Sequence, residues 1–223
     1  HPVNQEELAH DGPYVAAVLN GDVDNFKDLQ DKAGIRVAAE ITTDTKVIPT
    51  LVSRGLAEGM SLTDSFRQSV SAFDGSVAIG CNTAGAPDKL HLALRGSGQG
   101  IFVGLTEDTF LVASEPYGVV EATASYIRLD GETPGNPDNP SASQGQILVL
   151  DGSQAGELSG IERMAYDGTP LPVTDADLKT AEITTRDIDR GDNPHFFRKE
   201  ITEAPQSFRK TLRGKILKVG EQL

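Results

Sequence analysis

The spacing of apolar residues along the chain changes near Gly75. Before this glycine, apolar side chains mostly recur every three or four positions, which is the spacing of amphipathic helices. After it, short apolar runs alternate with polar and glycine-containing turns, which is the pattern of strands. The sequence therefore predicts an α+β architecture, in which antiparallel sheets lie beside helices.

One strand and one short helix are expected first. The apolar run "YVAAVLN" (14–20) is bounded by Gly-Pro and Asn-Gly pairs, so it predicts a buried strand. A helix is then expected to run to about Lys32, with Gly34 stopping it. Asp24 or Asn25 can serve as the N-cap of this helix.

Two longer helices are expected before the change of pattern. The first has Thr43 or Asp44 as its N-cap. It ends at Gly59, and the second helix spans 61–73. Each helix places its apolar residues on one face, as a helix that covers a sheet does. These residues are Val47, Ile48, Leu51, Val52 and Leu56 in the first, and Leu62, Phe66, Val70 and Phe73 in the second.

The central part of the chain predicts strands separated by turns and two longer irregular segments. The expected strands span 76–81, 90–95, 101–105, 109–113, 125–129 and 146–150, with turns at 85–87 and 107–108. The proline-rich segment 131–145 is expected to be a loop without core-forming residues. The polar, glycine-rich segment 151–181 is expected to be irregular, apart from a short helix near 175–179.

The composition argues against several classes of function. A formal net charge of −13 disfavours nucleic acid and anionic membrane surfaces as partners. No apolar run approaches the roughly 18 residues of a membrane-spanning helix. Cys81 is the single cysteine, so no internal disulfide can form, and a reducing cytoplasm fits this composition. No Cys/His spacing resembles a metal site, and nothing in the sequence calls for an organic cofactor.

The last 30 residues differ from the rest because basic residues outnumber acidic ones there. Phe196, Phe197, Ile201 and Phe208 add apolar side chains at helical spacing. A basic amphipathic segment on an acidic domain predicts a helical linker that docks on a further domain.

Several short stretches, in order, resemble class II glutamine amidotransferases of the N-terminal-nucleophile hydrolase type. "LNGDVDN" (19–25) is similar to the family turn "NG-[IV]-x-N", and "TTDTKVI" (42–48) to the element "ETDTEVI". "LRGSG…LVASEP" (94–116) is similar to a family strand pair, and His1-Pro2 to the end of "NAHP". "HFFRKEITEAP" (195–205) and "TLRGKI" (211–216) resemble the join to the sugar-isomerase half in the aminosugar-forming branch.

The resemblance implies both a fold and a domain plan. The fold is a four-layer αββα sandwich, incomplete at its N-terminus. Residues 1–185 would form the glutaminase domain, and 186–223 would form a linker into an absent sugar-isomerase domain. The implied function is to supply ammonia from L-glutamine, leaving L-glutamate, for synthesis of glucosamine 6-phosphate from fructose 6-phosphate. A full-length form would be a homodimer.

The resemblance also assigns an oxyanion role to Asn20 and Gly21. The Asn20 side-chain amide and the Gly21 backbone N–H would donate to the tetrahedral intermediate formed when a thiolate attacks the glutamine amide. The local alternative is an Asn-Gly type I′ hairpin turn, although "DVDNFKDLQ" after it lacks the alternation of a second strand.

Two further residues are substrate-binding candidates. Asp44 matches the family carboxylate that binds the α-ammonium group of glutamine, and its local alternative is a plain N-cap. Thr43 and Thr45 flank it as capping or packing residues. His1 matches a family histidine beside the active site.

The sequence departs from the family at its beginning. The family nucleophile is a cysteine at residue 1, where this chain has His1, and the family's carboxylate-binding arginine is missing. Cys81 is expected to be a small buried hydrophobic residue, and His91 a packed or surface strand residue. The 223 residues alone are therefore expected to be inactive. The alternatives are another class II amidotransferase, such as the purine-pathway enzyme, or a degenerate non-catalytic glutamine-binding module.

Overall fold

The chain divides into two compact units, His1–Ile183 and Thr184–Leu223. The computed structural model describes residues 14–181 of the first unit and residues 190–212 of the second.

Two antiparallel sheets form the centre of the first unit. Sheet A has the strand order β1-β2-β3-β7-β8, and sheet B has the order β5-β4-β6-β9. The strands of sheet A are β1 (Val15–Gly21), β2 (Val77–Thr83), β3 (Ala86–Arg95), β7 (Gln146–Asp151) and β8 (Ile161–Ala165). The strands of sheet B are β4 (Phe102–Leu105), β5 (Phe110–Ala113), β6 (Ser125–Arg128) and β9 (Lys179–Thr180).

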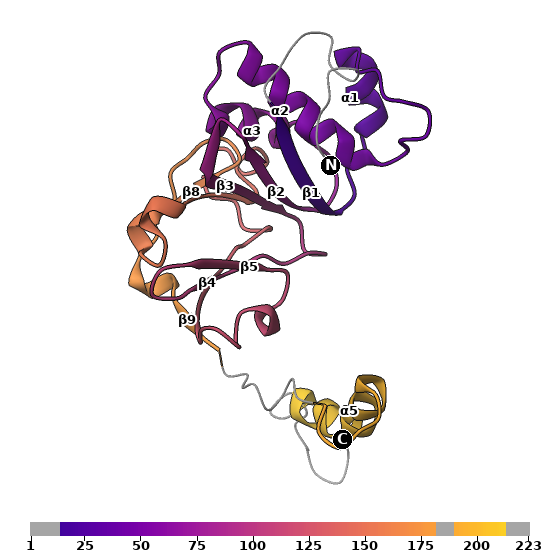
Figure 1. Ribbon diagram of the computed structural model, residues 1–223, viewed down its shortest axis with the longest axis vertical. Coiled ribbons are helices and arrows are strands. Elements are labelled where there is room, and N and C mark those ends of the chain that lie inside the picture. The colour runs from indigo at the N-terminus through magenta and orange to yellow at the C-terminus, as the bar shows by residue number, and fades with distance from the viewer. Residues whose placement is uncertain (1–13, 182–189, 213–223) are drawn as a thin grey trace. The chain divides into compact units, whose positions relative to one another are not determined.

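Three helices cover one face of sheet A, and sheet B lies on the other face (Figure 1). The helices are α1 (Phe26–Ala33), α2 (Val47–Ala57) and α3 (Leu62–Ser71), and the 3₁₀ turn Asp44–Lys46 leads into α2. Ile48, Phe66 and Val70 are fully buried between helices and sheet, which confirms the apolar faces expected for α2 and α3. The remaining short 3₁₀ turns are Pro116–Gly118, Gly152–Gln154, Leu158–Gly160 and Asp175–Asp177.

A second apolar cluster joins the two sheets. Leu92 and Leu148 from sheet A pack against Val103 and Ile127 from sheet B, and none of them is more than 2% exposed. The α+β sandwich expected from the sequence is therefore confirmed, with one helical layer and two sheet layers among the described residues of the first unit. A second outer helical layer is not represented in that part of the chain.

Sheet A differs from the expectation at both of its edges. The run 14–20 was expected to be a buried strand, but β1 lies at the edge, and Tyr14 and Val18 are 56% and 67% exposed. The segment 151–181 was expected to be irregular, but it contains β8, which pairs with β7. Long-range pairing rather than a local pattern creates β8, since "IERMA" has no clear alternation of apolar and polar residues.

The other local expectations hold with small shifts. The short helix expected near 175–179 is the 3₁₀ turn Asp175–Asp177, followed directly by β9. The turn expected at 85–87 lies at Ala84-Gly85, so β3 begins earlier than the sequence suggested. The segment 131–145 is a loop as expected, but Ser143 within it is fully buried and exchanges two hydrogen bonds with the Asn136 backbone.

The second unit contains one helix among its described residues, α5 (Phe196–Leu212). Phe196, Phe197, Ile201 and Phe208 are each more than half exposed within it. The role of this segment as an interdomain linker stays a prediction. Across the described residues, no helix combines the length and the apolar character needed to cross a membrane.

Cys81 and His91 are buried opposite each other in β2 and β3, as expected for packed residues. The Nε2 atom of His91 lies 3.0 Å from the Thr63 hydroxyl oxygen, and the ring contacts Phe66 edge-on. Burial, with a smaller contribution from Lys89, lowers the pKa of His91 to about 4. The folded protein therefore keeps this imidazole neutral.

The neutral imidazole of His91 predicts a pH-dependent loss of stability. A histidine in an unfolded chain titrates near pH ~6.5, so between pH ~6.5 and about 4 only the unfolded state takes up the proton. The free energy of unfolding should thus fall by about 1.5 kcal/mol from pH ~6.5 to ~5. We expect His91→Gln, which can still bond Thr63, to flatten this slope in urea titrations at several pH values. Equal slopes for the two proteins would contradict this account.

Candidate functional site

Asn20 and Gly21 are the last two residues of β1, where they pair with Ala78 and Val77 of β2. The chain then continues through a short loop into α1, without a second hairpin strand. The type I′ hairpin alternative is therefore wrong, because Asn20 and Gly21 lie within a sheet ladder rather than in the turn between two strands.

The ladder orients the backbone N–H of Gly21 away from β2. The N–H of Asp22 donates to the Ser76 carbonyl over 3.2 Å, so these two residues form a hydrogen-bonded pair. In an antiparallel ladder such pairs alternate with pairs that exchange no hydrogen bond. Gly21 and Val77 form the next pair, so the Gly21 N–H is directed toward the edge of sheet A. An N–H in this position can donate to a bound ligand.

Gly21 is required by a close contact between two backbone segments. Its φ is +111°, and a Cβ atom there would lie 2.0 Å from the Ser76 carbonyl oxygen. Gly75 has a φ of +113°, and its Cβ would lie 2.2 Å from the Asp22 carbonyl oxygen. Any side chain at either position would force these backbones apart.

Asn25 joins the loop after Gly21 to the segment between α3 and β2. Its side-chain amide donates to the Ala72 carbonyl over 2.9 Å and accepts from the Asp74 N–H over 3.0 Å. Asn25, one of the two expected N-cap residues, does occupy the N-cap position of α1, but its side chain makes no cap hydrogen bond there. Asn25 is the last residue of the motif "LNGDVDN", and its place in that motif is the sequence signal that could have identified it as a residue that positions the loop.

Asp44 connects the start of α2 to the same loop. Its Oδ2 atom accepts the Val23 N–H over 2.8 Å. The N-cap of the 3₁₀ turn is Thr43, whose hydroxyl accepts from the Thr45 N–H, so the plain N-cap alternative for Asp44 is wrong. Its other oxygen has only a marginal 3.5 Å contact with the Thr43 hydroxyl, which leaves it available for a ligand.

An acidic cavity of about 380 Å³ lies at this loop. Its lining contains three carboxylates, those of Asp22, Asp24 and Asp44, and no cationic side chain. The local field therefore favours a cation such as an ammonium group. No group of three or more His, Cys, Asp or Glu side chains arranged to hold a metal ion occurs among the described residues.

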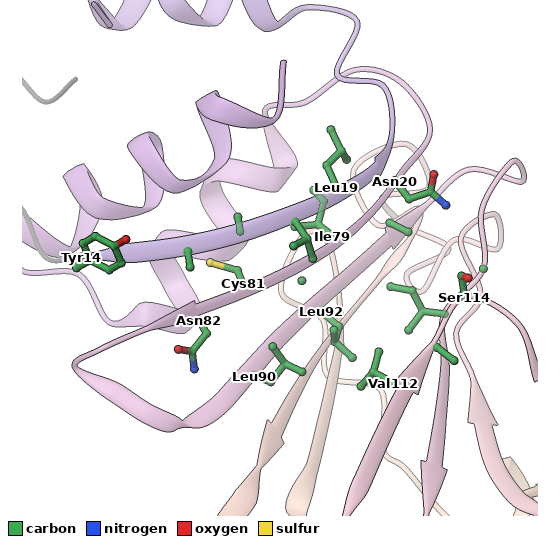
Figure 2. Close-up of a pocket in the computed structure, with 18 residues that line it drawn as sticks. Tyr14, Leu19, Asn20, Ile79, Cys81, Asn82, Leu90, Leu92, Val112 and Ser114 are labelled. Carbon is green, nitrogen blue, oxygen red and sulfur yellow. The ribbon is translucent and has the colours of Figure 1, made fainter. Parts of the chain in front are cut away.

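The Asn20 side chain lies on the other side of β1, facing sheet B. It borders an apolar cavity of about 680 Å³ whose lining includes Val18, Ala78 and Val112 (Figure 2). It also borders a polar cavity of about 270 Å³ lined in part by Ser114 and Arg128. A polar ligand group at the end of β1 can therefore contact the Asn20 amide.

Cys81 cannot act on a group held by Asn20. Side chains of directly paired residues share one face of a sheet, so Asn20 lies on the face of Ala78. Cys81 is three residues from Ala78 along β2 and so points to the opposite face, into the core beneath the helices. Burial raises the pKa of its thiol to about 12, which keeps it protonated.

The structure thus brings three of the four predicted site residues to one end of β1. Asn20 and Gly21 occupy the strand end, and Asp44 is joined to the loop that follows. The fourth, His1, lies outside the described residues, as does His10.

Comparisons with known proteins agree with the motifs in the sequence. No family model matches. The chain is 26% identical over 188 residues to a glutamine–fructose-6-phosphate aminotransferase (isomerizing) from Bacillus cereus, covering 84% of this chain. Enzymes of the same name are 26% identical in Streptococcus mutans, over 95% of this chain, and 27% identical in Methanothermobacter thermautotrophicus, over 89%. The chain spans only 27% to 32% of the length of these relatives.

A solved structure supports the fold. The allosteric regulatory enzyme of purine biosynthesis superposes with a TM-score of 0.50 at 22% identity, over 71% of this chain and 30% of that one. At this identity the likeness shows the fold alone. The resemblance to a class II glutamine amidotransferase domain is confirmed, and over most of the chain it is a resemblance to the aminosugar-forming branch.

The contact at Gly21 predicts an unusually costly substitution. Gly21→Ala combines an unfavourable φ with a clash against the Ser76 backbone, so we expect it to lower the free energy of unfolding by about 3 kcal/mol or more. Gly59→Ala is the matched control, because its φ is +91° but a Cβ there would meet nothing within 4 Å. The control should cost only about 1 kcal/mol. If urea unfolding shows that both variants lose the same free energy of unfolding, the close contact at Gly21 is contradicted.

Proposed function

We propose that this chain is the glutaminase part of an enzyme that takes ammonia from L-glutamine to make glucosamine 6-phosphate from fructose 6-phosphate. The observation that carries the proposal is the Asp44–Val23 hydrogen bond. It places a carboxylate beside the loop that begins at Gly21, whose N–H is directed to the sheet edge. The end of β1 and the start of the 3₁₀ turn therefore offer a hydrogen-bond donor and an anionic group to the two ends of the same amino acid.

The first step of the proposed mechanism is binding of the amino acid. The free oxygen of Asp44 accepts from the α-ammonium group, and the neighbouring Asp22 and Asp24 strengthen the attraction. From Gly21 to Val23 the chain spans at most about 7 Å. The side chain of glutamine, two methylenes and an amide, can bridge this span and bring its carbonyl oxygen to the end of β1.

The second step is stabilisation of the charge that develops on that oxygen. The N–H of Gly21 and the side-chain amide of Asn20 donate to the oxyanion once a thiolate attacks the amide carbon. The C–N bond then breaks as the nitrogen takes up the thiol's proton, carried by the nucleophile's own α-amino group, so that ammonia leaves and a glutamyl thioester remains. Water attacks this thioester, which releases L-glutamate and restores the thiol. No cofactor takes part in these steps.

The nucleophile of this mechanism comes from outside the sequence. Cys81 is the only cysteine in the 223 residues, and it points away from Asn20. The inactivity expected for the chain by itself therefore remains part of the proposal. Docking of 186–223 on a sugar-isomerase domain, a homodimeric full-length form and a cytoplasmic location belong to the proposal in the same way.

The same pocket would serve two alternatives: another class II amidotransferase, or a non-catalytic glutamine-binding module. The non-catalytic module is consistent with the lack of a nucleophilic cysteine at the site. Binding alone, however, needs the carboxylate of Asp44 and does not need a backbone N–H directed to the sheet edge, where it can donate to an oxyanion. The direction of the Gly21 N–H therefore favours the catalytic proposal over the non-catalytic one.

The proposal predicts L-glutamate binding that depends on the charge of Asp44. Asp44→Asn keeps an oxygen for the Val23 N–H but removes the charge, so affinity should fall about 10- to 100-fold. Asp28→Asn is the matched control, because Asp28 is exposed on α1 and does not line the acidic cavity. Isothermal titration calorimetry measures both. Equal affinities for the two variants, with both folded by thermal melting, would contradict the assignment.

A further inference from the structure

A separate cavity of about 450 Å³ lies within the helical layer, between α1, α2 and α3. It shares no lining residue with the acidic cavity at Asp44 or with the cavities that Asn20 borders. Close packing of α2 on α3 forms one wall, since a Cβ at Gly55 would lie 2.2 Å from the Ser65 hydroxyl oxygen. Helix α1 forms the opposite wall and has no fully buried residue.

Arg54 lines this cavity, and the hydrogen-bonding capacity of its guanidinium group is only partly satisfied. Its Nη1 atom donates to the carbonyl of Ala33, the last residue of α1. Its Nε and Nη2 atoms are shielded from solvent and have no hydrogen-bond partner. Within the described ranges, no acidic side chain forms an ion pair with Arg54. Buried charged donors without partners cost free energy, and an acceptor that reached them would recover it.

The Nε/Nη2 edge of Arg54, which has no hydrogen-bond partner, has the geometry to bind an anion that carries two oxygens. The Nε–H and one Nη2–H of a guanidinium are parallel and match the two oxygens of a carboxylate or phosphate. Lys32 lines the same cavity and adds a second positive charge, against one acidic residue, Glu58. The lining is therefore net positive in a chain whose overall charge is −13.

We propose that this cavity is an anion-binding site, in which the Arg54 side chain turns so that a carboxylate or phosphate group bridges its Nε/Nη2 edge and the ammonium group of Lys32. The ligand would join α2 to the C-terminal end of α1. Because α1 buries no residue completely, such a bridge would stabilise the helix that follows the loop 22–25. The site stands independently of the glutaminase proposal.

The first experiment is titration of the chain with inorganic phosphate at constant ionic strength, followed by calorimetry and by thermal unfolding. We expect saturable binding in the millimolar range and a rise in Tm. Arg54→Gln keeps a donor for Ala33 but loses the charged edge, so it should weaken binding about 10-fold or more. Lys32→Gln should weaken it about 3-fold. Glu58→Gln should tighten binding, because it removes the competing carboxylate.

Arg36→Gln is the matched control, since Arg36 is exposed and does not line the cavity. No saturable phosphate binding by the wild-type chain, or equal loss in the Arg54 and Arg36 variants, would overturn the proposal. If Arg54→Gln does not fold, opposite effects of Lys32→Gln and Glu58→Gln support the site, and unchanged affinities in both refute it.

A competition arm identifies the source of the anion. A short glutamate-rich peptide that displaces phosphate would indicate that a polypeptide carboxylate occupies the site. Displacement by acetate or citrate but not by the peptide would indicate a small free anion. Either result supports the site.

Discussion

The candidate active site depends on one close contact between two backbone segments. The backbone of Gly21 and Asp22 lies against that of Gly75 and Ser76, and no space is left for a side chain at either glycine. This contact fixes the direction in which the chain leaves β1. The hydrogen bonds of Asp44 to Val23 and of Asn25 to Ala72 and Asp74 then hold the loop that follows. The position of each proposed ligand-binding group follows from this packing.

The alternation of side chains along β1 and β2 determines which residues can take part in chemistry. On the face toward sheet B, Asn20 meets open cavities, and Ala78 beside it is small. On the face toward the helices, Cys81 and His91 are packed in apolar surroundings. Burial raises the pKa of the thiol and lowers that of the imidazole, so both stay neutral. Cys81 and His91 thus have a structural role, and the side-chain amide of Asn20 at the end of β1 is the group available to a ligand.

Sequence patterns predicted the elements whose signals are local. Helices α2 and α3 follow from apolar periodicity, and Asn20, Gly21 and Asp44 were found through motifs. What the patterns missed depends on distant partners: β8 exists because it pairs with β7, and Asn25 binds residues about fifty positions away in sequence. Capping preferences named Thr43 or Asp44 as the N-cap, and Thr43 is the N-cap. The bond from Val23 to Asp44 is a tertiary contact that no local rule predicts.

Isotope-edited NMR of this chain titrated with L-glutamate tests the central claim most directly. L-Norvaline is the matched ligand, because it has the α-ammonium group without the side-chain carboxylate. The account predicts that both ligands shift the Val23 N–H resonance through Asp44. Only L-glutamate should shift the Gly21 backbone N–H and the Asn20 side-chain amide. If L-glutamate binds and leaves the Gly21 and Asn20 resonances unchanged, these residues are not the oxyanion site.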